Sequence, residues 1–426
     1  MFRLPFVSLF AIGLFALPVL LTGCVAYEPT PVDWAKEAAA LDEAPRQIAL
    51  SVDDVRVRTV AFSPALNAQR QSLAASAAKA AASGWWEDPT LNADFLRVLS
   101  APENPLVYGG SLAFTIPLSG IPALEKRAAE AYAEADRWAL VAAERDAAGE
   151  AAVEAVTARE TAAFIATLAQ TLNGTNYVGA LDVARRLADV GEMPRADYEQ
   201  LVADSREWRR TAFEMGHERA AAEASLRKKM MLAPTCEIAW RDAGCEPQMP
   251  TNAYTSLDFT NAPSVRAAVA RLTGGEMELD REIRRQYPEL SVGPAYTRED
   301  GYNRVGITGS LTLPLWNRNR VGIATATGTR DDARLAAVAA WQSAVRRWHD
   351  LKLEQERLHV RGVESPADVA SAERLYEIGE LDAAGYVGVV HRALTEAQTS
   401  LRLRIDTAAL AERMKSIVEG MTFKGE

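Results

Sequence analysis

The sequence is poor in cysteine, histidine and aromatic residues. Its 426 residues include three cysteines and four histidines, and 7% of them are Phe, Trp or Tyr. The four histidines have no His or Cys partner at i+3 or i+4, so they predict helix surfaces or seams rather than metal ligands. They are His217, His349, His359 and His391. No phosphate-binding loop, nucleophile elbow or metalloprotease helix is found either. We therefore expect neither an enzyme nor a protein with a cofactor or metal.

Basic residues are outnumbered, with 47 Lys and Arg against 57 Asp and Glu, a formal charge of −10. Proteins that grip phosphate backbones need a basic face, so nucleic acid is not an expected partner. Alanine is abundant instead, in runs such as AASAAKAAAS. Such runs favour thin, closely packed helices over a thick globule.

The N-terminal residues predict a secretory signal and a site of lipid attachment. Residues 1–23 carry one charge, Arg3, before an apolar run, and the segment ends in Leu-Thr-Gly followed by Cys24. These features are typical of a cleaved secretory signal, and the ending resembles the bacterial lipobox, which implies acylation of Cys24. A single transmembrane helix is the alternative, since the run is about long enough to span. Val25, rather than Asp, follows the cysteine, which resembles an outer-membrane sorting signal.

The two other cysteines, Cys236 and Cys245, lie nine residues apart. In an oxidising periplasm this spacing predicts a short-loop disulfide that pins a linker. Two free buried thiols are the alternative.

Four short motifs occur twice, in the same order, at offsets of 199, 199, 197 and 188 residues. The pairs are 63–66 with 262–265, 89–91 with 288–290, 114–118 with 311–315, and 186–192 with 374–380. Self-similarity of this kind indicates a duplicated structural unit.

Each copy is expected to contain a helix, a β-hairpin and a long helical hairpin. The expected hairpins span 90–116 and 290–315, and the helical tips lie near 191 and 379. The full division is a signal peptide (1–23), an N-terminal segment (24–62), copy one (63–231), a linker (232–261), copy two (262–420) and a tail (421–426). Copy two is nine residues shorter between strand and tip, with the difference near 361–366.

The second strand of copy two alternates in character. One parity is mainly apolar and the other small and polar, as in a membrane barrel strand with lipid outside and water inside. The first set includes Val305, Ile307, Leu311, Leu313 and Leu315; the second is Gly306, Thr308, Ser310 and Thr312.

Four strands cannot close into a membrane barrel, whose smallest common size is about eight. An open sheet edge in hydrocarbon leaves backbone groups unpaired at several kcal/mol each. Three chains would supply twelve strands and a water-filled bore.

The long helices taken alone also fit a soluble coiled coil, because Leu335, Val338 and Trp341 begin a heptad-like seam.

The duplicated order of elements, the Pro-x-Leu before each first strand and the Leu313–Arg320 segment LPLWNRNR resemble the outer membrane factor (TolC-like) family. The lipoprotein branch that serves resistance-nodulation-division efflux systems is the most similar. The resemblance implies a mainly α fold with a small β part. It also implies a homotrimer with a twelve-stranded outer-membrane β-barrel continued by a periplasmic α-helical barrel. The implied partners are a periplasmic adaptor, an inner-membrane efflux transporter and outer-membrane lipid.

The same resemblance assigns residues at the helical tips. It implies a glycine at each turn, Gly191 and Gly379, and a gate in which Tyr376 and Asp197 hydrogen-bond between neighbouring hairpins. An ordinary left-handed helix cap is the plainer reading of each glycine, and it is compatible with the gate.

Copy two departs from the family pattern at the gate. Leu381 replaces an expected Arg, and Gly385 and Gly388 replace the inner acidic ring. The sequence therefore predicts a passive exit duct whose gate lacks those charges. The alternative is a non-channel periplasmic coiled-coil lipoprotein with a structural or adaptor role, which would have no need for the apolar strand face.

Overall fold

A computed structural model describes residues 27–43, 45–97, 106–241, 257–299, 301–361 and 369–418. The chain divides into two units, Met1–Pro45 and Arg46–Glu426. In the first unit, helix α2 (Trp34–Asp42) begins where the Asp33 carboxylate accepts hydrogen bonds from two backbone N–H groups, both at 3.1 Å. That carboxylate satisfies donors that the first turn of a helix leaves unpaired.

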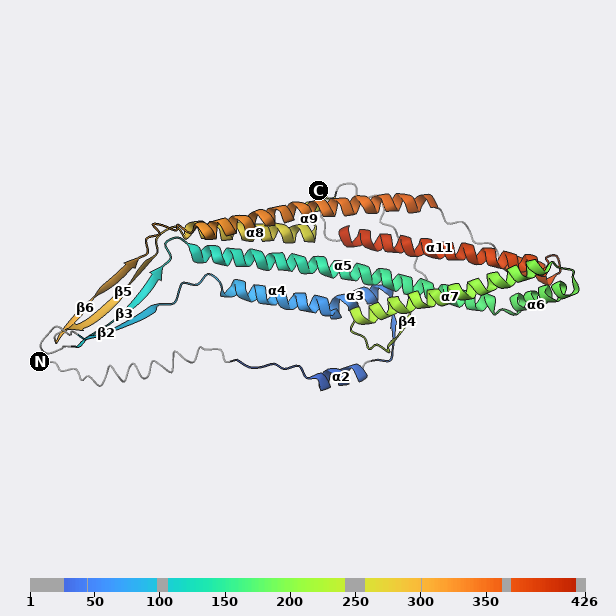
Figure 1. Ribbon diagram of the computed structural model, residues 1–426, viewed down its shortest axis with the longest axis horizontal. Helices are drawn as coiled ribbons and strands as arrows, with labels where there is room; N and C mark the ends of the chain where they lie inside the picture. The colour runs from blue at the N-terminus through green and yellow to red at the C-terminus, as the bar shows by residue number, and fades with distance from the viewer. Residues whose placement is uncertain are drawn as a thin grey trace. The chain divides into compact units, whose positions relative to one another are not determined.

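The second unit repeats one succession of elements. The first copy consists of α4 (Pro64–Ala82), β2 (Thr90–Arg97), β3 (Leu106–Ile116), α5 (Ile121–Leu172), α6 (Thr175–Val190) and α7 (Arg195–Lys229). The second consists of α8 (Pro263–Arg284), β5 (Leu290–Glu299), β6 (Tyr302–Leu311), α9 (Arg320–Arg361), α10 (Val369–Glu377) and α11 (Ala383–Val418). The expected fold class, mainly helical with a small β part and a duplicated unit, is confirmed (Figure 1).

The long strands form one antiparallel sheet in the order β2-β3-β5-β6. β3 of the first copy pairs with β5 of the second, which leaves β2 and β6 at the edges. The second hairpin turns at Gly301, whose φ of 81° is a left-handed conformation that glycine adopts without strain. β6 ends at Leu311 rather than at the expected residue 315, because Pro314 has no N–H to donate to the ladder.

A smaller pair of strands joins the segment before copy one to the linker. β1 (Gln47–Leu50) lies parallel to β4 (Glu237–Trp240), and helix α3 (Val52–Phe62) follows β1. Ser51 and Asp54 form a capping box at the start of α3, and Arg241 donates to the Asp54 carboxylate at 2.6 Å. The Arg241–Asp54 contact therefore joins the linker to the start of α3.

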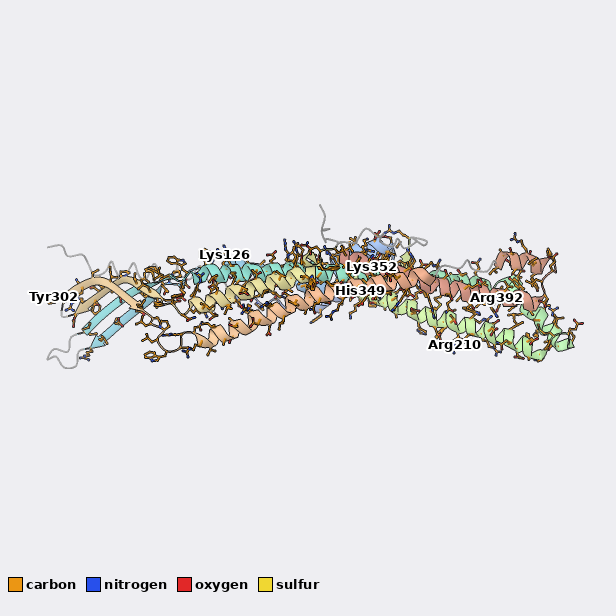
Figure 2. The ribbon with its side chains drawn as sticks, turned by 90° about the horizontal axis from the view of Figure 1, so that it is seen from above. Lys126, Arg210, Tyr302, His349, Lys352 and Arg392 are labelled. Carbon is orange, nitrogen blue, oxygen red and sulfur yellow. The ribbon has the colours of Figure 1, made fainter. Side chains whose placement is uncertain are left out.

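The long helices run side by side away from the sheet. Figure 1 shows α8 beside α5 and α9 beside α8, with the turn between α6 and α7 at the end opposite the sheet. Figure 2 shows Tyr302 at the outer end of the sheet, and the exposed cations Lys126, Arg210 and Arg392 along the helices.

The core of the second unit changes in character along its length. Between Ala128 and Ala158 the buried face of α5 is mostly alanine, which lets neighbouring helices approach closely. Larger buried side chains gather nearer the tips, where Leu168, Tyr177 and Leu401 belong to one cluster from α5, α6 and α11. A second cluster around Trp348, Leu410 and Met414 joins α9 to α11. The length difference between the copies is expected near 361–366, and all of these residues except Arg361 lie outside the described residues.

Candidate functional site

The four-stranded sheet has one apolar face and one small, polar face. Strand pairing places Leu91, Phe95, Phe114, Leu290, Val292, Tyr296, Val305, Ile307 and Leu311 on the same face. The opposite face carries Asn92, Ser111, Thr115, Ser291, Thr297, Thr308 and Ser310. Hydrogen bonds cross the strands on that polar face, from Asn92 to Ser111 at 3.4 Å and between Thr115 and Ser291 at 3.1 Å.

The apolar face has no cover within the described chain. Val305, Ile307, Phe95 and Leu91 are all exposed, although they form one continuous surface. A contiguous exposed apolar surface marks a partner or a membrane. Both edge strands are also unpaired within the described residues, so the sheet is open on two sides.

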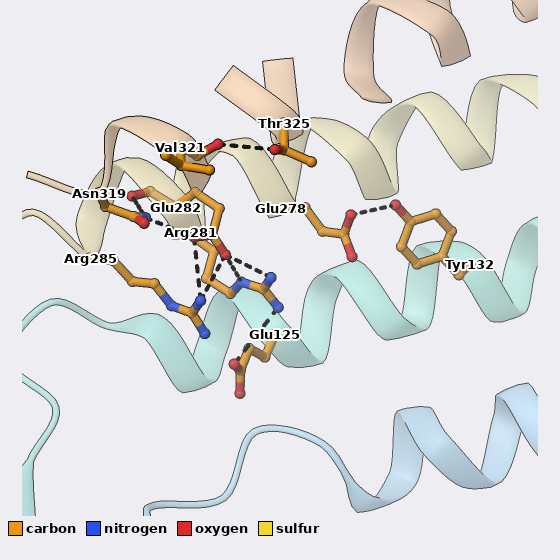
Figure 3. Close-up of polar contacts among 9 residues, drawn as sticks. All are labelled: Glu125, Tyr132, Glu278, Arg281, Glu282, Arg285, Asn319, Val321 and Thr325. Atoms are coloured by element: carbon orange, nitrogen blue, oxygen red, sulfur yellow. Dashed lines mark hydrogen bonds and ion pairs between the residues drawn. The ribbon is translucent and has the colours of Figure 1, made fainter. Parts of the chain in front are cut away.

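A buried carboxylate, Glu282, anchors the passage from the sheet into α9 (Figure 3). Asn319 donates to the Glu282 carboxylate at 2.7 Å and to its backbone carbonyl at 2.9 Å. Arg281 and Arg285 approach the same carboxylate at 2.8 and 3.0 Å. Burial alone raises the pKa of Glu282, but the hydrogen bonds from Asn319 and Arg281 outweigh it and hold the pKa below its ordinary value of 4.5.

The backbone at this joint is also constrained. Arg318 and Asn319 have φ of 47° and 48°, a left-handed conformation that few residues other than glycine adopt. Gly322 lies against both the Asn319 and the Glu282 side chains, where a Cβ would collide. The second copy's sheet-to-helix joint is therefore held by specific side chains of the LPLWNRNR segment and α8.

Helix α8 also holds the joint of the first copy. Arg284 donates to the backbone carbonyl of Ser119 at 3.1 Å, in the turn between β3 and α5. Further along α5, the Tyr132 hydroxyl donates to Glu278 at 3.0 Å (Figure 3). Burial is the main cause, and the Glu278 carboxylate the second, of a rise in the pKa of Tyr132 to about 12. Tyr132 therefore remains an uncharged donor that links α5 to α8.

Both helical tips have the same backbone geometry. Gly191 and Gly379 have φ of 81° and 78°. After Gly191, the next two backbone N–H groups donate to the Leu187 carbonyl at 2.9 and 3.2 Å; after Gly379, the corresponding pair donates to Leu375 at 2.9 and 3.1 Å. These left-handed caps reverse the chain and satisfy carbonyls at the helix end.

The residues assigned to the gate are not joined within one chain. Tyr376 stacks on Tyr386, with ring centroids 4.8 Å apart and an interplanar angle of 12°. Asp197 is exposed in the first turn of α7. Among the described residues of the single chain, no hydrogen bond links Tyr376 to Asp197, so a latch between hairpins of neighbouring chains stays a prediction.

Two contacts near the tips were not foreseen from the sequence. Asn176 of α6 donates to Glu373 and Glu377 of α10 at 2.6 and 3.1 Å, which ties the two helical hairpins together. The Tyr177 hydroxyl is hydrogen-bonded to Ser205 at 2.6 Å and to His391 Nε2 at 2.7 Å. His391 thus occupies a seam between copies, where burial lowers its pKa from 6.5.

Of the remaining residues assigned from the sequence, the structure describes only some. Cys236 is buried, but Cys245 and Cys24 lie outside the described residues, so the disulfide and the lipid anchor stay predictions. Within the described ranges, no group of three His, Cys, Asp or Glu side chains could hold a metal ion. In those ranges, too, no helix combines the length and the hydropathy needed to cross a membrane.

No protein-family model and no curated protein matches the sequence. Solved structures do match. A membrane protein from Pseudomonas aeruginosa has a TM-score of 0.71 at 14% identity, over 95% of this chain and 98% of that one. The CmeC outer membrane channel of Campylobacter jejuni has a TM-score of 0.66 at 13% identity, over 95% and 92% of the two chains. The VceC outer membrane protein of Vibrio cholerae has a TM-score of 0.66 at 15% identity, over 87% and 96%.

Two of these likenesses cover 95% of this chain, so they include both copies of the duplicated unit. The chain therefore has the fold of TolC-like outer-membrane channels, and its resemblance to the outer membrane factor family is confirmed at the level of the fold.

Proposed function

We propose that the protein is the outer-membrane exit duct of a tripartite efflux pump. The observation that carries this proposal is the open sheet with one exposed apolar face and one small, polar face. Backbone groups at the edges of β2 and β6 need partners in hydrocarbon, and four strands are too few to close. A homotrimer supplies twelve strands, with lipid on the apolar side and water on the polar side.

The helices extend this duct into the periplasm as an α-helical barrel. The alanine-rich face of α5 lets neighbouring helices approach closely, so the helices of three copies can form a thin wall around a water-filled path. The duct itself does no chemistry, and the driving force comes from an inner-membrane transporter reached through a periplasmic adaptor that docks at the tips. The acidic balance of the chain favours cations over anions along the path.

Lipidation at Cys24 would add a second attachment to the outer membrane. Each buried CH₂ of an acyl chain contributes about 0.8 kcal/mol, so several chains bind a membrane firmly. A bridge between Cys236 and Cys245 would pin the linker near β4. Tyr376 and Asp197 would close the periplasmic entrance by pairing between neighbouring hairpins, without the charged ring that Gly385 and Gly388 replace.

Single-channel recording in a planar bilayer tests both the duct and its gate. We expect a low conductance for the wild-type trimer and a several-fold higher one for the double variant Tyr376→Phe with Asp197→Ala, because the entrance loses its closing hydrogen bond. The control is Tyr302→Phe with Asp189→Ala. Tyr302 lies at the far end of the sheet, and Asp189 already pairs with Arg195 at 3.0 Å within its own tip.

No conductance from the wild type or the double variant, together with a monomeric mass in detergent, would rule out the duct. That result would favour a non-channel coiled-coil lipoprotein. Equal conductance of the wild type and the double variant would leave the duct in place and reject the Tyr376–Asp197 gate.

A further inference from the structure

Helix α11 presents one continuous polar stripe that its own chain does not cover. The members are three or four residues apart, so they share one side of the helix. They are Gly385, Gly388, Arg392, Thr395, Thr399, Arg402 and Asp406; the two glycines are partly exposed and the other five are exposed. The opposite side of α11 is buried in the second unit, through Tyr386, Val390 and Leu394. We call the exposed set the α11 stripe.

Arg392 is the charged member of the α11 stripe nearest the helical tips (Figure 2). It lies seven residues, or about 10 Å, beyond Gly385 along the helix. Arg392 forms no ion pair within the described residues, and Glu396, one turn further on, is more covered and is not paired with it. The hydroxyls of Thr395 and Thr399 donate to backbone carbonyls of α11, both at 2.9 Å. The described chain therefore leaves the Arg392 charge without a paired counter-ion.

Arg402 has different electrostatic surroundings on the same stripe. It borders a groove of about 430 Å³ between α7 and α11, and the α7 side of this groove carries Glu207, Glu214 and Glu218. These carboxylates offset the Arg402 charge without direct contact, because Coulomb interactions extend beyond ion-pair distance. A multivalent anion is therefore disfavoured beside Arg402 and favoured beside Arg392.

The α11 stripe also differs from the other exposed surfaces near the tips. Exposed apolar side chains occur there on α6 and α10, and they are Val178, Val183, Val190, Leu375 and Ile378. Among its described residues, α11 exposes no large apolar side chain. An exposed apolar surface is suited to contact with another protein, whereas a polar surface is suited to water. In the proposed duct, the α11 stripe is therefore the surface near the tips that fits the water-filled path.

The glycines at the tip end of the stripe leave room for neighbouring subunits. Gly388 lies inside α11, where glycine costs up to about 1 kcal/mol relative to alanine. A Cβ at this position would meet nothing within 4 Å in the described chain, so packing within that chain does not require glycine. A helix face without side chains lets the α11 helices of neighbouring subunits approach closely at the entrance. Arg392, one turn beyond Gly388, is then the first charged side chain of the stripe along the path.

We propose that the Arg392 side chains of three subunits form a cationic ring just inside the periplasmic entrance, and that this ring binds multivalent anions. The inference rests on the proposed function, since it requires three copies around one path. Rings of Arg or Lys favour anions in pores, and guanidinium groups bind phosphate through charged hydrogen bonds. The acidic balance of the chain acts along the whole path, whereas the ring acts at one level and reverses the preference there.

Calorimetric titration with tripolyphosphate tests the ring in the full-length trimer, purified in mild detergent at low ionic strength, where screening is weak. We expect one tripolyphosphate per three chains, because a ring shared by three subunits forms one site. Arg392→Gln should weaken binding by about tenfold or more, whereas Arg392→Lys, which keeps the charge, should retain most of it. The matched control is Arg402→Gln on the same stripe, which should bind as the wild type does.

Bilayer recording gives a second readout of the same ring. Tripolyphosphate added on the side of the tips should block the wild-type channel, and the concentration for half block should rise by about tenfold or more in Arg392→Gln. In a KCl gradient, this substitution should also move the reversal potential toward that of K⁺. Arg402→Gln should change neither quantity by a comparable amount.

The outcomes distinguish the ring from the duct. Trimeric, conducting protein that binds no tripolyphosphate, or binds it equally well after Arg392→Gln, would overturn the ring and leave the duct intact. One anion per chain would also overturn the ring, since it would place the three arginines at separate sites. Loss of binding in Arg392→Lys as complete as in Arg392→Gln would reject the role of the charge. Protein that is monomeric and does not conduct would overturn both the ring and the duct.

Discussion

Three polar side chains from three helices meet in the core near the helical tips. Tyr177 of α6 contacts Ser205 of α7 and His391 of α11, and His391 is only 9% exposed. The groups that face the imidazole are the Tyr177 hydroxyl and the Asp204 carboxylate, whose Oδ2 lies 3.8 Å from Nδ1. Because this network crosses from one copy to the other, its protonation state affects how the two helical hairpins pack.

The first prediction concerns pH. Burial lowers the pKa of His391 and the Asp204 charge only partly offsets it, so the folded state favours the neutral imidazole. The unfolded chain then binds more protons as pH falls below about 6.5, and the contribution of His391 to stability, full above that pH, is progressively lost. The thermal unfolding midpoint of the wild type should therefore fall more steeply between about pH 7.5 and 5.5 than that of His391→Gln.

The control for this prediction is His349→Gln, which removes an exposed histidine from α9. Its midpoint should follow the wild-type pH dependence, as measured by circular dichroism. A wild-type profile that coincides with His391→Gln would mean that the imidazole does not titrate differently on folding.

Single residues were predictable from the sequence where a local rule decides them. Gly191 and Gly379 follow from the left-handed turn that a helical tip needs, and the alternation in β6 follows from its period of two. The partners of His391 were not predictable, because Tyr177 and Asp204 lie 214 and 187 residues away along the chain and no local pattern links them. The Glu282 joint was missed for the same reason, since its cap, Asn319, comes from another element.

At the scale of elements, the strand–helix joints determine where each long helix begins, and the turns at the helical tips determine where the chain reverses. Chain order and approximate bounds followed from the duplicated motifs, but the pairing of β3 with β5 did not, because two hairpins can meet along either edge. The early end of β6 follows a local rule: Pro314 has no N–H to donate, so the ladder does not extend through it.

The second prediction compares two glycines of α6 and its tip. Gly191→Ala places a Cβ at φ of 81°, which costs about 1 kcal/mol or more. Gly179→Ala, inside the same helix with open space around it, should instead stabilise by up to about 1 kcal/mol through higher helix propensity. We therefore expect opposite shifts of the unfolding midpoint, measured by thermal denaturation in detergent. Equal shifts would indicate that the tip does not require its left-handed turn.

At the scale of the whole molecule, the single chain leaves surfaces that need partners. The apolar face and both edges of the sheet are open within the described residues. Helix α9 adds an exposed apolar stripe of Leu335, Val338 and Trp341, spaced by three residues. Such a stripe on a long helix is suited to packing against a helix of another subunit. In the proposed duct, further copies of the chain would cover the open sheet edges and the α9 stripe.

The third prediction tests that assembly through α9. Leu335→Arg places an unpaired charge in the stripe, so the trimer should weaken relative to the monomer by about tenfold or more, equivalent to about 1.4 kcal/mol or more. The control Ala336→Arg adds the same charge at the next position, about 100° around the helix, on the side away from Val338 and Trp341. Light scattering in mild detergent gives the mass of each variant. Trimers from Leu335→Arg as stable as those from Ala336→Arg would place the subunit contact elsewhere, whereas selective loss of the trimer would assign α9 to the interface that closes the duct.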